Sequence, residues 1–175
     1  MAAPPAGRFW RRPDLLRVQA IVVKSSAQLT PQDPEFETRV RDSFARQRFM
    51  TTLGARLARV AAGEVDIELD VRDDLTQQHG FLHAGVLAAA ADSACGYAAF
   101  SLMPVGAAVL SVEFKINLLA PAVGERVVAR ARVIRAGKTI TVCWADVTAY
   151  AGTTERLIAT MVGTMMTVRD RAVPD

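Results

Sequence analysis

The chain has 175 residues and a mass of 18.9 kDa, which is enough for one domain with a sizeable core and hardly enough for two. Hydrophobic residues make up 51% and charged residues 22%, a balance that excludes disorder over most of the chain. The net charge of +3 first suggests a nucleic-acid or membrane-surface partner. However, residues 1–48 hold nine basic and five acidic side chains, a net of +4, and the rest carries −1, so neither partner is expected.

The N-terminal segment and the cysteines bear on location. Residues 1–33 are rich in proline and arginine, and we expect a loosely structured basic arm with one short element near residues 14–23. No uninterrupted apolar segment follows the N-terminal arginines, which argues against a secretory signal. Cys95 and Cys143 have apolar neighbours and are expected to be reduced and buried, so a cytoplasmic location is the default expectation.

Hydrophobic spacing and turn residues assign residues 34–170 to a single domain. Asp33 and Pro34 form a helix start signal, because the aspartate can cap free N–H groups and proline needs none in the first turn. They predict an amphipathic helix over residues 34–52. Alternation of apolar and acidic side chains predicts a half-buried strand over residues 64–71. After a second helix, turn residues separate four more predicted strands, over residues 107–119, 125–136, 139–150 and 156–168.

The second helix is expected over residues 84–103, an apolar stretch that ends before Pro104. Its length is that of a membrane span, but Asp92 lies at its middle, where an ionised carboxylate in lipid costs several kcal/mol. Alanine is also a weak membrane inserter. We therefore expect a buried helix in a soluble domain. Because short connections join the last three strands, the element order predicts an α+β fold in which an antiparallel sheet wraps this one helix.

The segment before this helix concentrates polar residues at a helix N-terminus, over residues 76–85. Free N–H groups and the positive end of the helix dipole there favour an anion or a developing oxyanion. His79 and His83 have the four-residue spacing of a two-histidine metal site, but Gly80 disfavours helix between them and carboxylates would have to complete the ligand set. An exposed loop histidine is the simpler interpretation of His79. No nucleophile elbow or phosphate loop is present.

Asp92 is the second polar anomaly. Its neighbours one and two helical turns away are all small, so the carboxylate faces either a packed neighbour or a cavity. It is a candidate base or nucleophile, and capping of another segment's backbone is an equally good interpretation. His83 lies nine residues earlier, about 180° round the helix and roughly 13 Å along it. If both residues are catalytic, each site must combine two chains, which predicts a two-fold dimer.

Taken together, these residues resemble the PaaI-type branch of the hotdog-fold acyl-CoA thioesterases, in the 4-hydroxybenzoyl-CoA thioesterase-like superfamily. The resemblance covers about residues 35–168. It is carried by Gln77, by the turn Gly80-Phe81-Leu82-His83-Ala84-Gly85 and by Asp92, with support from residues 110–122 and from Gly137-Lys138-Thr139. It implies a hotdog fold, preceded here by an N-terminal helix, and hydrolysis of an acyl-CoA to free acid and CoA.

The resemblance also implies roles for individual residues. Asp92 would be the base or nucleophile, and the Ala84 N–H would polarise the thioester carbonyl. Gln77 would orient the substrate or water, His83 would hold the turn or contact the thioester, and Ser111 would assist the water. The family's dimer pairs Gln77 and His83 of one subunit with Asp92 and Ser111 of the other. Ala84 replaces the glycine that is usual in the turn, which mildly narrows the pocket.

For the substrate, no metal or redox cofactor is implied, because CoA is itself part of the substrate. Gly85 is expected to approach the CoA, and Arg135 and Lys138 are candidates for its phosphates, although each is also explained as a solvated hairpin charge. The depth of the pocket should depend on Phe81, Tyr97, Phe100 and Met103. A homodimer is expected, and dimers could pair into tetramers. Two alternatives stay open: an acyl-thioester hydratase or dehydratase on the same fold, and a non-catalytic acyl-CoA-binding protein.

Overall fold

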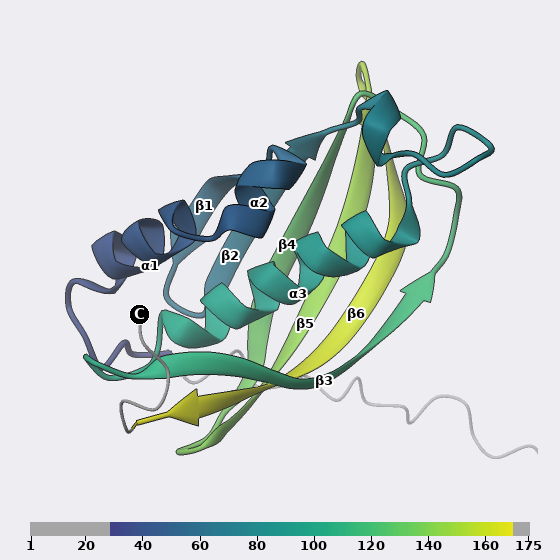
Figure 1. Cartoon of the computed structure of the whole chain (residues 1–175). Coiled ribbons are helices and arrows are strands. Elements are labelled where there is room, and N and C mark those ends of the chain that lie inside the picture. The colour runs from purple at the N-terminus through teal and green to yellow at the C-terminus, as the bar shows by residue number, and fades with distance from the viewer. Residues whose placement is uncertain (1–28, 170–175) are drawn as a thin grey trace, which may run out of the picture.

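One antiparallel sheet and one long helix define the architecture. The computed structural model describes residues 29–169, so most of the predicted arm, with its short element near residues 14–23, lies outside the described residues. Six strands form the sheet in the order β1-β2-β4-β5-β6-β3, and it curves around α3, which lies across its concave face (Figure 1). The elements are α1 (Phe36–Ala45), α2 (Arg48–Leu53), β1 (Arg56–Ala61), β2 (Glu64–Asp70), the 3-10 turn η2 (Asp73–Leu75), α3 (Ala84–Phe100), β3 (Ala108–Leu118), β4 (Arg126–Ala136), β5 (Ile140–Ala151) and β6 (Thr154–Val168).

This arrangement confirms the predicted α+β fold with a sheet wrapped around one helix. β4, β5 and β6 are antiparallel neighbours, as the short connections between them predicted. The bounds of the last four strands differ from the predicted ones by no more than two residues. They agree because turn residues bound each strand, and β5 also alternates regularly between the core and the outer face.

α3 forms the centre of the core. Its alanines let five strands pack closely against the helix, and most of its residues are buried. Cys143 of β5 donates its thiol to the carbonyl oxygen of Cys95 (3.4 Å), and both cysteines are free and buried, as predicted. The neighbouring Cys143 thiol and burial raise the pKa of Cys95, which keeps this thiol protonated. None of the helices within residues 29–169 is long and apolar enough to cross a membrane.

The predicted helix over residues 34–52 is wrong in one respect, because the structure has two helices there, broken at Gln47. Gln47 has an extended backbone, and α2 then ends at Gly54, whose φ is +68°. Val40 of α1 and Met50 of α2 are both buried. Ten residues of one straight helix turn by about 280°, only 80° short of a full turn, so the spacing of these two side chains also fits a continuous helix.

β1 is an element that the sequence analysis did not predict. It is an edge strand, and only Leu57 and Val60 offer large apolar side chains, both half-buried. Its pairing with β2 shifts register between Leu57 and Arg59. The irregularity interrupts the regular alternation of apolar and polar side chains that identifies a strand in a sequence.

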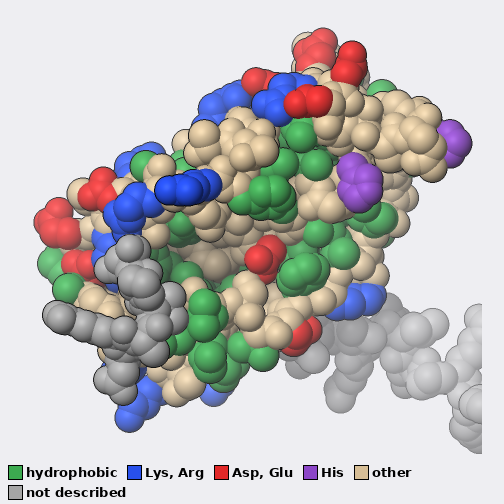
Figure 2. Space-filling model, viewed as in Figure 1, with side chains coloured by type: hydrophobic (Ala, Val, Ile, Leu, Met, Phe, Trp, Pro, Cys, Tyr) green, Lys and Arg blue, Asp and Glu red, His purple; other side chains and the backbone are tan. Residues whose placement is uncertain are grey.

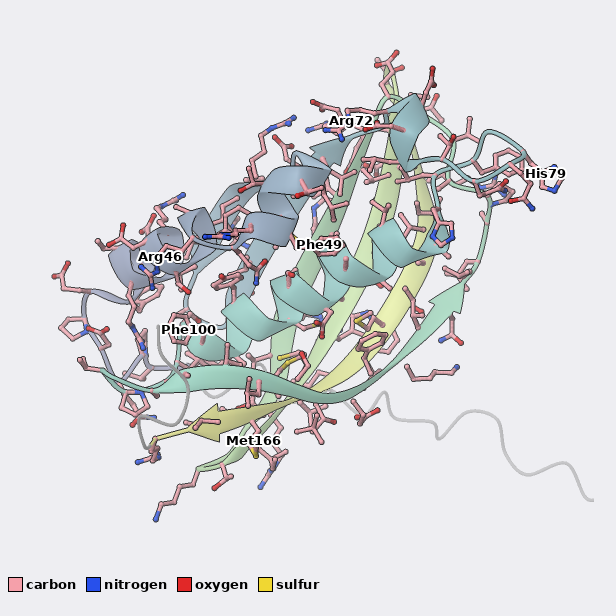
Figure 3. The ribbon with its side chains drawn as sticks, viewed as in Figure 1. Arg46, Phe49, Arg72, His79, Phe100 and Met166 are labelled. Atoms are coloured by element: carbon pink, nitrogen blue, oxygen red, sulfur yellow. The ribbon has the colours of Figure 1, made fainter. Side chains whose placement is uncertain are left out.

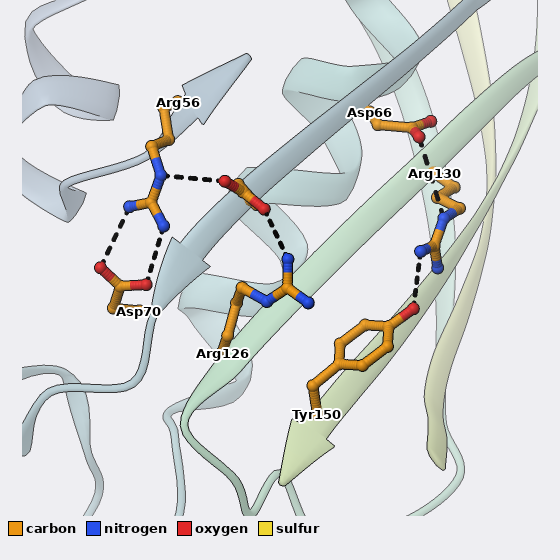
Figure 4. Close-up of polar contacts among 7 residues, drawn as sticks. Arg56, Asp66, Asp70, Arg126, Arg130 and Tyr150 are labelled. Carbon is orange, nitrogen blue, oxygen red and sulfur yellow. Dashed lines mark hydrogen bonds and ion pairs between the residues drawn. The ribbon is translucent and has the colours of Figure 1, made fainter. Parts of the chain in front are cut away.

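The outer face of β1, β2, β4 and β5 carries a network of ion pairs (Figure 4). Arg56 bonds both carboxylate oxygens of Asp70 (2.9 and 3.0 Å) and also Glu68, which in turn accepts from Arg126 (2.9 Å). The hydrogen bonds from Arg56 lower the pKa of Asp70. Such exposed pairs contribute little each, but they join neighbouring strands and leave this face with mixed charge.

Candidate active site

A cavity of about 300 Å³ opens beside the middle of α3. It lies between the C-terminal half of α3, the start of β3 and the junction of α1 with α2, and Figure 2 shows the hollow on this face, with an acidic side chain at its edge. The lining residues are Ser43, Arg46, Gln47, Asp92, Ser93, Gly96, Tyr97, Phe100, Ala108, Val109 and Ser111.

Asp92 lines this cavity and is half-buried. Its Oδ1 accepts a hydrogen bond from the hydroxyl of Ser111 (2.7 Å), which comes from β3, far along the chain. Within residues 29–169 no hydrogen bond links Asp92 to the backbone of another segment, so the capping alternative finds no contact to support it. The carboxylate is therefore held by one side-chain donor and open to a ligand.

A local irregularity of β3 accompanies Ser111. The pairing of β3 with β6 shifts register between Ser111 and Glu113. Such bulges re-aim side chains near functional sites. Here the hydroxyl of Ser111 reaches α3, while Met165 of β6 lies 3.4 Å away through its sulfur.

Replacing Ser111 by alanine is expected to lower kcat about tenfold while the protein stays folded, because one hydrogen bond to a charged group contributes about 1.5–3 kcal/mol. Steady-state rates of the thioester hydrolysis that the sequence resemblance implies measure this effect. Ser111→Thr is the matched control, since it keeps the hydroxyl and suits a strand. Equal activity of Ser111→Ala and wild type would contradict the role.

The loop before α3 is held by its own backbone. Thr76 and Leu82 form an isolated bridge, and the turn between them needs Gly80 at φ +79°. The side-chain oxygen of Gln77 accepts the His79 N–H, which leaves its amide NH₂ free to donate outward. His79 itself is exposed at the tip of the loop (Figure 3), which fits the interpretation as a loop histidine.

His83 is the N-cap of α3. Its Nδ1 accepts the N–H of Gly85 (2.9 Å), and its carbonyl accepts the N–H of Val86 (2.9 Å). Gly85, predicted to approach CoA, thus has its N–H occupied within the chain. The N–H of Ala84 has no acceptor among the described residues and is left as the donor at this helix end.

Gln77 and Ala84 line a second cavity, of about 400 Å³, whose walls are mainly apolar. Asp92 and Ser111 do not line it, and His83 and Gly85 line a third one, of about 400 Å³. Eight residues of helix separate Ala84 from Asp92, about 12 Å along the axis. The structure therefore divides these predicted site residues into three pairs, one in each cavity, rather than bringing them together in one cavity of a single chain. The second cavity is lined by Gln77, Phe81, Leu82, Ala84, Leu87, Leu118, Leu119, Ala120, Pro121 and Ala122.

Arg135 and Lys138, predicted to hold the CoA phosphates, are exposed at the turn between β4 and β5. Lys138 lines a small crevice of about 30 Å³ together with Arg169, whose guanidinium donates to the Lys138 carbonyl (3.4 Å). Neither predicted cation lines the cavity of Asp92. Within residues 29–169, no group of His, Cys, Asp and Glu side chains is arranged to hold a metal ion.

Ser43, Arg46 and Gln47 line the Asp92 cavity but were not among the predicted site residues. They lie where α1 gives way to α2, and no sequence signal marked that break. By contrast, Tyr97 and Phe100, expected to set the depth of the pocket, do line it.

Comparison with known proteins defines the class. The family model of the thioesterase superfamily matches residues 79–157. A protein of Saccharolobus solfataricus, named as an esterase, is 30% identical over 131 residues, which cover 75% of this chain and 85% of that protein. The crystal structure of a thioesterase family protein from Silicibacter pomeroyi is 52% identical, with a TM-score of 0.76, and covers 77% of this chain and 99% of that one.

The PaaI protein from the phenylacetic acid degradation operon of E. coli has the same fold, with a TM-score of 0.70, 20% identity, and coverage of 77% of this chain and 94% of that one. The fold is thus that of the hotdog proteins. The chain belongs to the thioesterase superfamily and is a thioester hydrolase. The resemblance found in the sequence is confirmed.

Proposed function

We propose that the protein is an acyl-CoA thioesterase whose active sites are each shared by two protomers. One observation carries the proposal. The carboxylate of Asp92, with Ser111, and the free N–H of Ala84, with Gln77, lie in different cavities of one chain. A thioester carbonyl can contact a carboxylate and that N–H at once only if a second copy supplies one of them.

The free edge of β3 supports this pairing. β3 bonds β6 on one side, and within the described residues no strand lies on its other side. Several large apolar side chains of β3, and one just after its end, are exposed. A second β3 added antiparallel across a two-fold axis would cover these side chains, which are Leu110, Val112, Phe114 and Leu118 with Leu119.

In the proposed reaction, water adds to the thioester carbonyl carbon while Asp92 takes its proton. The carbonyl oxygen, which becomes an oxyanion, accepts a hydrogen bond from the Ala84 N–H of the other protomer. The C–S bond then breaks, and the CoA thiolate receives a proton. Alternatively, Asp92 attacks the carbon directly, and water cleaves the resulting anhydride. Both routes yield free acid and CoA and need the same carboxylate.

The CoA moiety would extend away from this point. Its phosphates are anionic, and Arg135 and Lys138 are exposed cations that could meet them. The amide NH₂ of Gln77 is available to donate to the substrate carbonyl or to the water.

Subunit mixing is the experiment that tests the proposal. Ala84→Pro removes only the N–H of the first helical residue, where proline fits a helix, and His83 before it already has the extended backbone that proline requires (φ −64°, ψ 137°). We expect Ala84→Pro to lower kcat about 10²-fold, because it removes an oxyanion donor. Asp92→Asn should be inactive as well.

Refolding the two variants together should restore about a quarter of wild-type activity, because half of the dimers then hold one intact site out of two. Thiol release from a series of acyl-CoAs is the assay, and loss of enoyl-CoA without thiol release would identify a hydratase instead. The control is a chain with both substitutions mixed with either single variant, which creates no intact site. No recovery in the first mixture would show that each site lies within one chain.

A further inference from the structure

The cavity beside Asp92 has more polar groups than an alkyl chain can use. Resting on the proposed function, we infer that this cavity receives a short acyl group that ends in a carboxylate, that is, the monothioester of a short dicarboxylic acid. The Arg46 guanidinium would bind that carboxylate, and Tyr97 and Ser43 would donate hydrogen bonds beside it.

The wall opposite β3 is built of hydroxyls and an amide. The Ser43 hydroxyl and the Tyr97 hydroxyl lie 3.4 Å apart, and the Ser93 hydroxyl donates to the Gln47 side-chain oxygen over 3.4 Å. Tyr97 is buried, with 6% of its surface exposed. An alkyl chain placed here would form no hydrogen bond with these groups, whereas a carboxylate could accept from their hydroxyls.

Arg46 is an exposed arginine that adds a positive charge to the lining of this cavity. Its Nη1 donates to the backbone oxygen of Asp42 (3.2 Å), and within the described residues no acidic side chain lies within ion-pair distance of it. Burial raises the pKa of Tyr97, and hydrogen bonding to Ser43 and the charge of Arg46 oppose that rise. Arg46 and Tyr97 line the same cavity. A carboxylate is the group that would satisfy both.

The spacing suits a short chain. Tyr97 follows Asp92 by about 7.5 Å along α3, and Gly96 leaves room between them. Phe100 continues the floor, and its ring is fixed by the Arg39 guanidinium, 4.4 Å from the ring centroid. Figure 3 shows Arg46 near the end of α1, on the side of the cavity that faces Phe100 of α3. A thioester carbonyl at Asp92 thus leaves the far end of a short acyl chain beside Arg46.

The test compares acyl groups of equal carbon number: adipoyl-CoA, hexanoyl-CoA and hydroxyhexanoyl-CoA with a terminal hydroxyl. Thiol release should give a kcat/KM at least about tenfold higher for adipoyl-CoA than for the other two, since a hydrogen-bonded charge pair is worth that much. Arg46→Gln should remove this preference by lowering kcat/KM for adipoyl-CoA to the level found for hexanoyl-CoA with the same variant. Arg48→Gln is the matched control, because Arg48 is an exposed arginine two residues away that does not line the cavity.

Binding separates this inference from the proposed function. The dissociation constants of adipoyl-CoA and hexanoyl-CoA for Asp92→Asn, measured by calorimetry, report on the cavity without turnover. Tighter binding of adipoyl-CoA that depends on Arg46 supports the inference, whether or not any acyl-CoA is hydrolysed. Absence of hydrolysis would overturn only the proposed function. Equal binding and equal rates for adipoyl-CoA and hexanoyl-CoA would overturn the inference that the acyl group ends in a carboxylate. A preference for hydroxyhexanoyl-CoA would overturn it as well.

Discussion

Asp92→Asn is expected to lower kcat/KM for thioester hydrolysis by about 10³-fold, within the range that removal of a general base produces. Asparagine has the same shape and can still accept the Ser111 hydrogen bond, so the cavity should keep its form. An amide can neither take the water proton at neutral pH nor attack the carbonyl. Thiol release under saturating and limiting substrate measures the loss, which should fall mainly on kcat.

Three controls sharpen this result. Asp92→Glu keeps a carboxylate and should retain part of the activity. Asp73→Asn removes an exposed carboxylate of η2 that lines none of the described cavities and should be unaffected. Thermal unfolding of Asp92→Asn should match wild type, so that lost activity reflects chemistry. Wild-type rates in both Asp92→Asn and Asp92→Ala would exclude this carboxylate from the mechanism.

The central helix and the strands after it could be predicted because several sequence patterns indicate the same elements. The run around Asp92 is too apolar and too rich in alanine for a surface helix, and each strand that follows is bounded by turn residues. Asp92 could be predicted as a site residue because its helical neighbours are all small, and small side chains around a carboxylate leave room for a cavity. The roles of the site residues came from the resemblance rather than from spacing.

What could not be predicted depends on tertiary contacts. No proline or glycine marks the break at Gln47, and the apolar spacing of Val40 and Met50 also fits one continuous helix. In the sequence, Arg46 has the pattern of an ordinary charge on an amphipathic helix. Its position in the lining of the Asp92 cavity could not be predicted from that pattern. Likewise, the hydrogen bond between Asp92 and Ser111 joins residues from different elements, and spacing within one element cannot reveal it.

Arg39 shows how α1 is held where the cavity needs it. Its guanidinium donates to three carbonyl oxygens at the end of α3, those of Phe100, Met103 and Pro104, at 2.8–3.3 Å. It also pairs with the buried carboxylate of Asp33 at 2.8 Å, the residue predicted to start this helix, whose Oδ1 accepts the Glu35 N–H. One side chain thus closes the C-terminus of α3 and fixes the N-terminus of α1.

Arg39→Met is therefore expected to destabilise the protein by about 3–5 kcal/mol, because it leaves the Asp33 carboxylate buried without its counter-charge. Urea unfolding at fixed protein concentration measures this loss. Arg41→Met is the control on the same helix: Arg41 pairs with Glu37 at the surface, so its loss should cost less than about 1 kcal/mol. Equal effects of the two substitutions would mean that Arg39 is no more than a surface charge. Since α1 carries Ser43 and Arg46 to the cavity, Arg39→Met should also weaken any preference for adipoyl-CoA at temperatures where the protein remains folded.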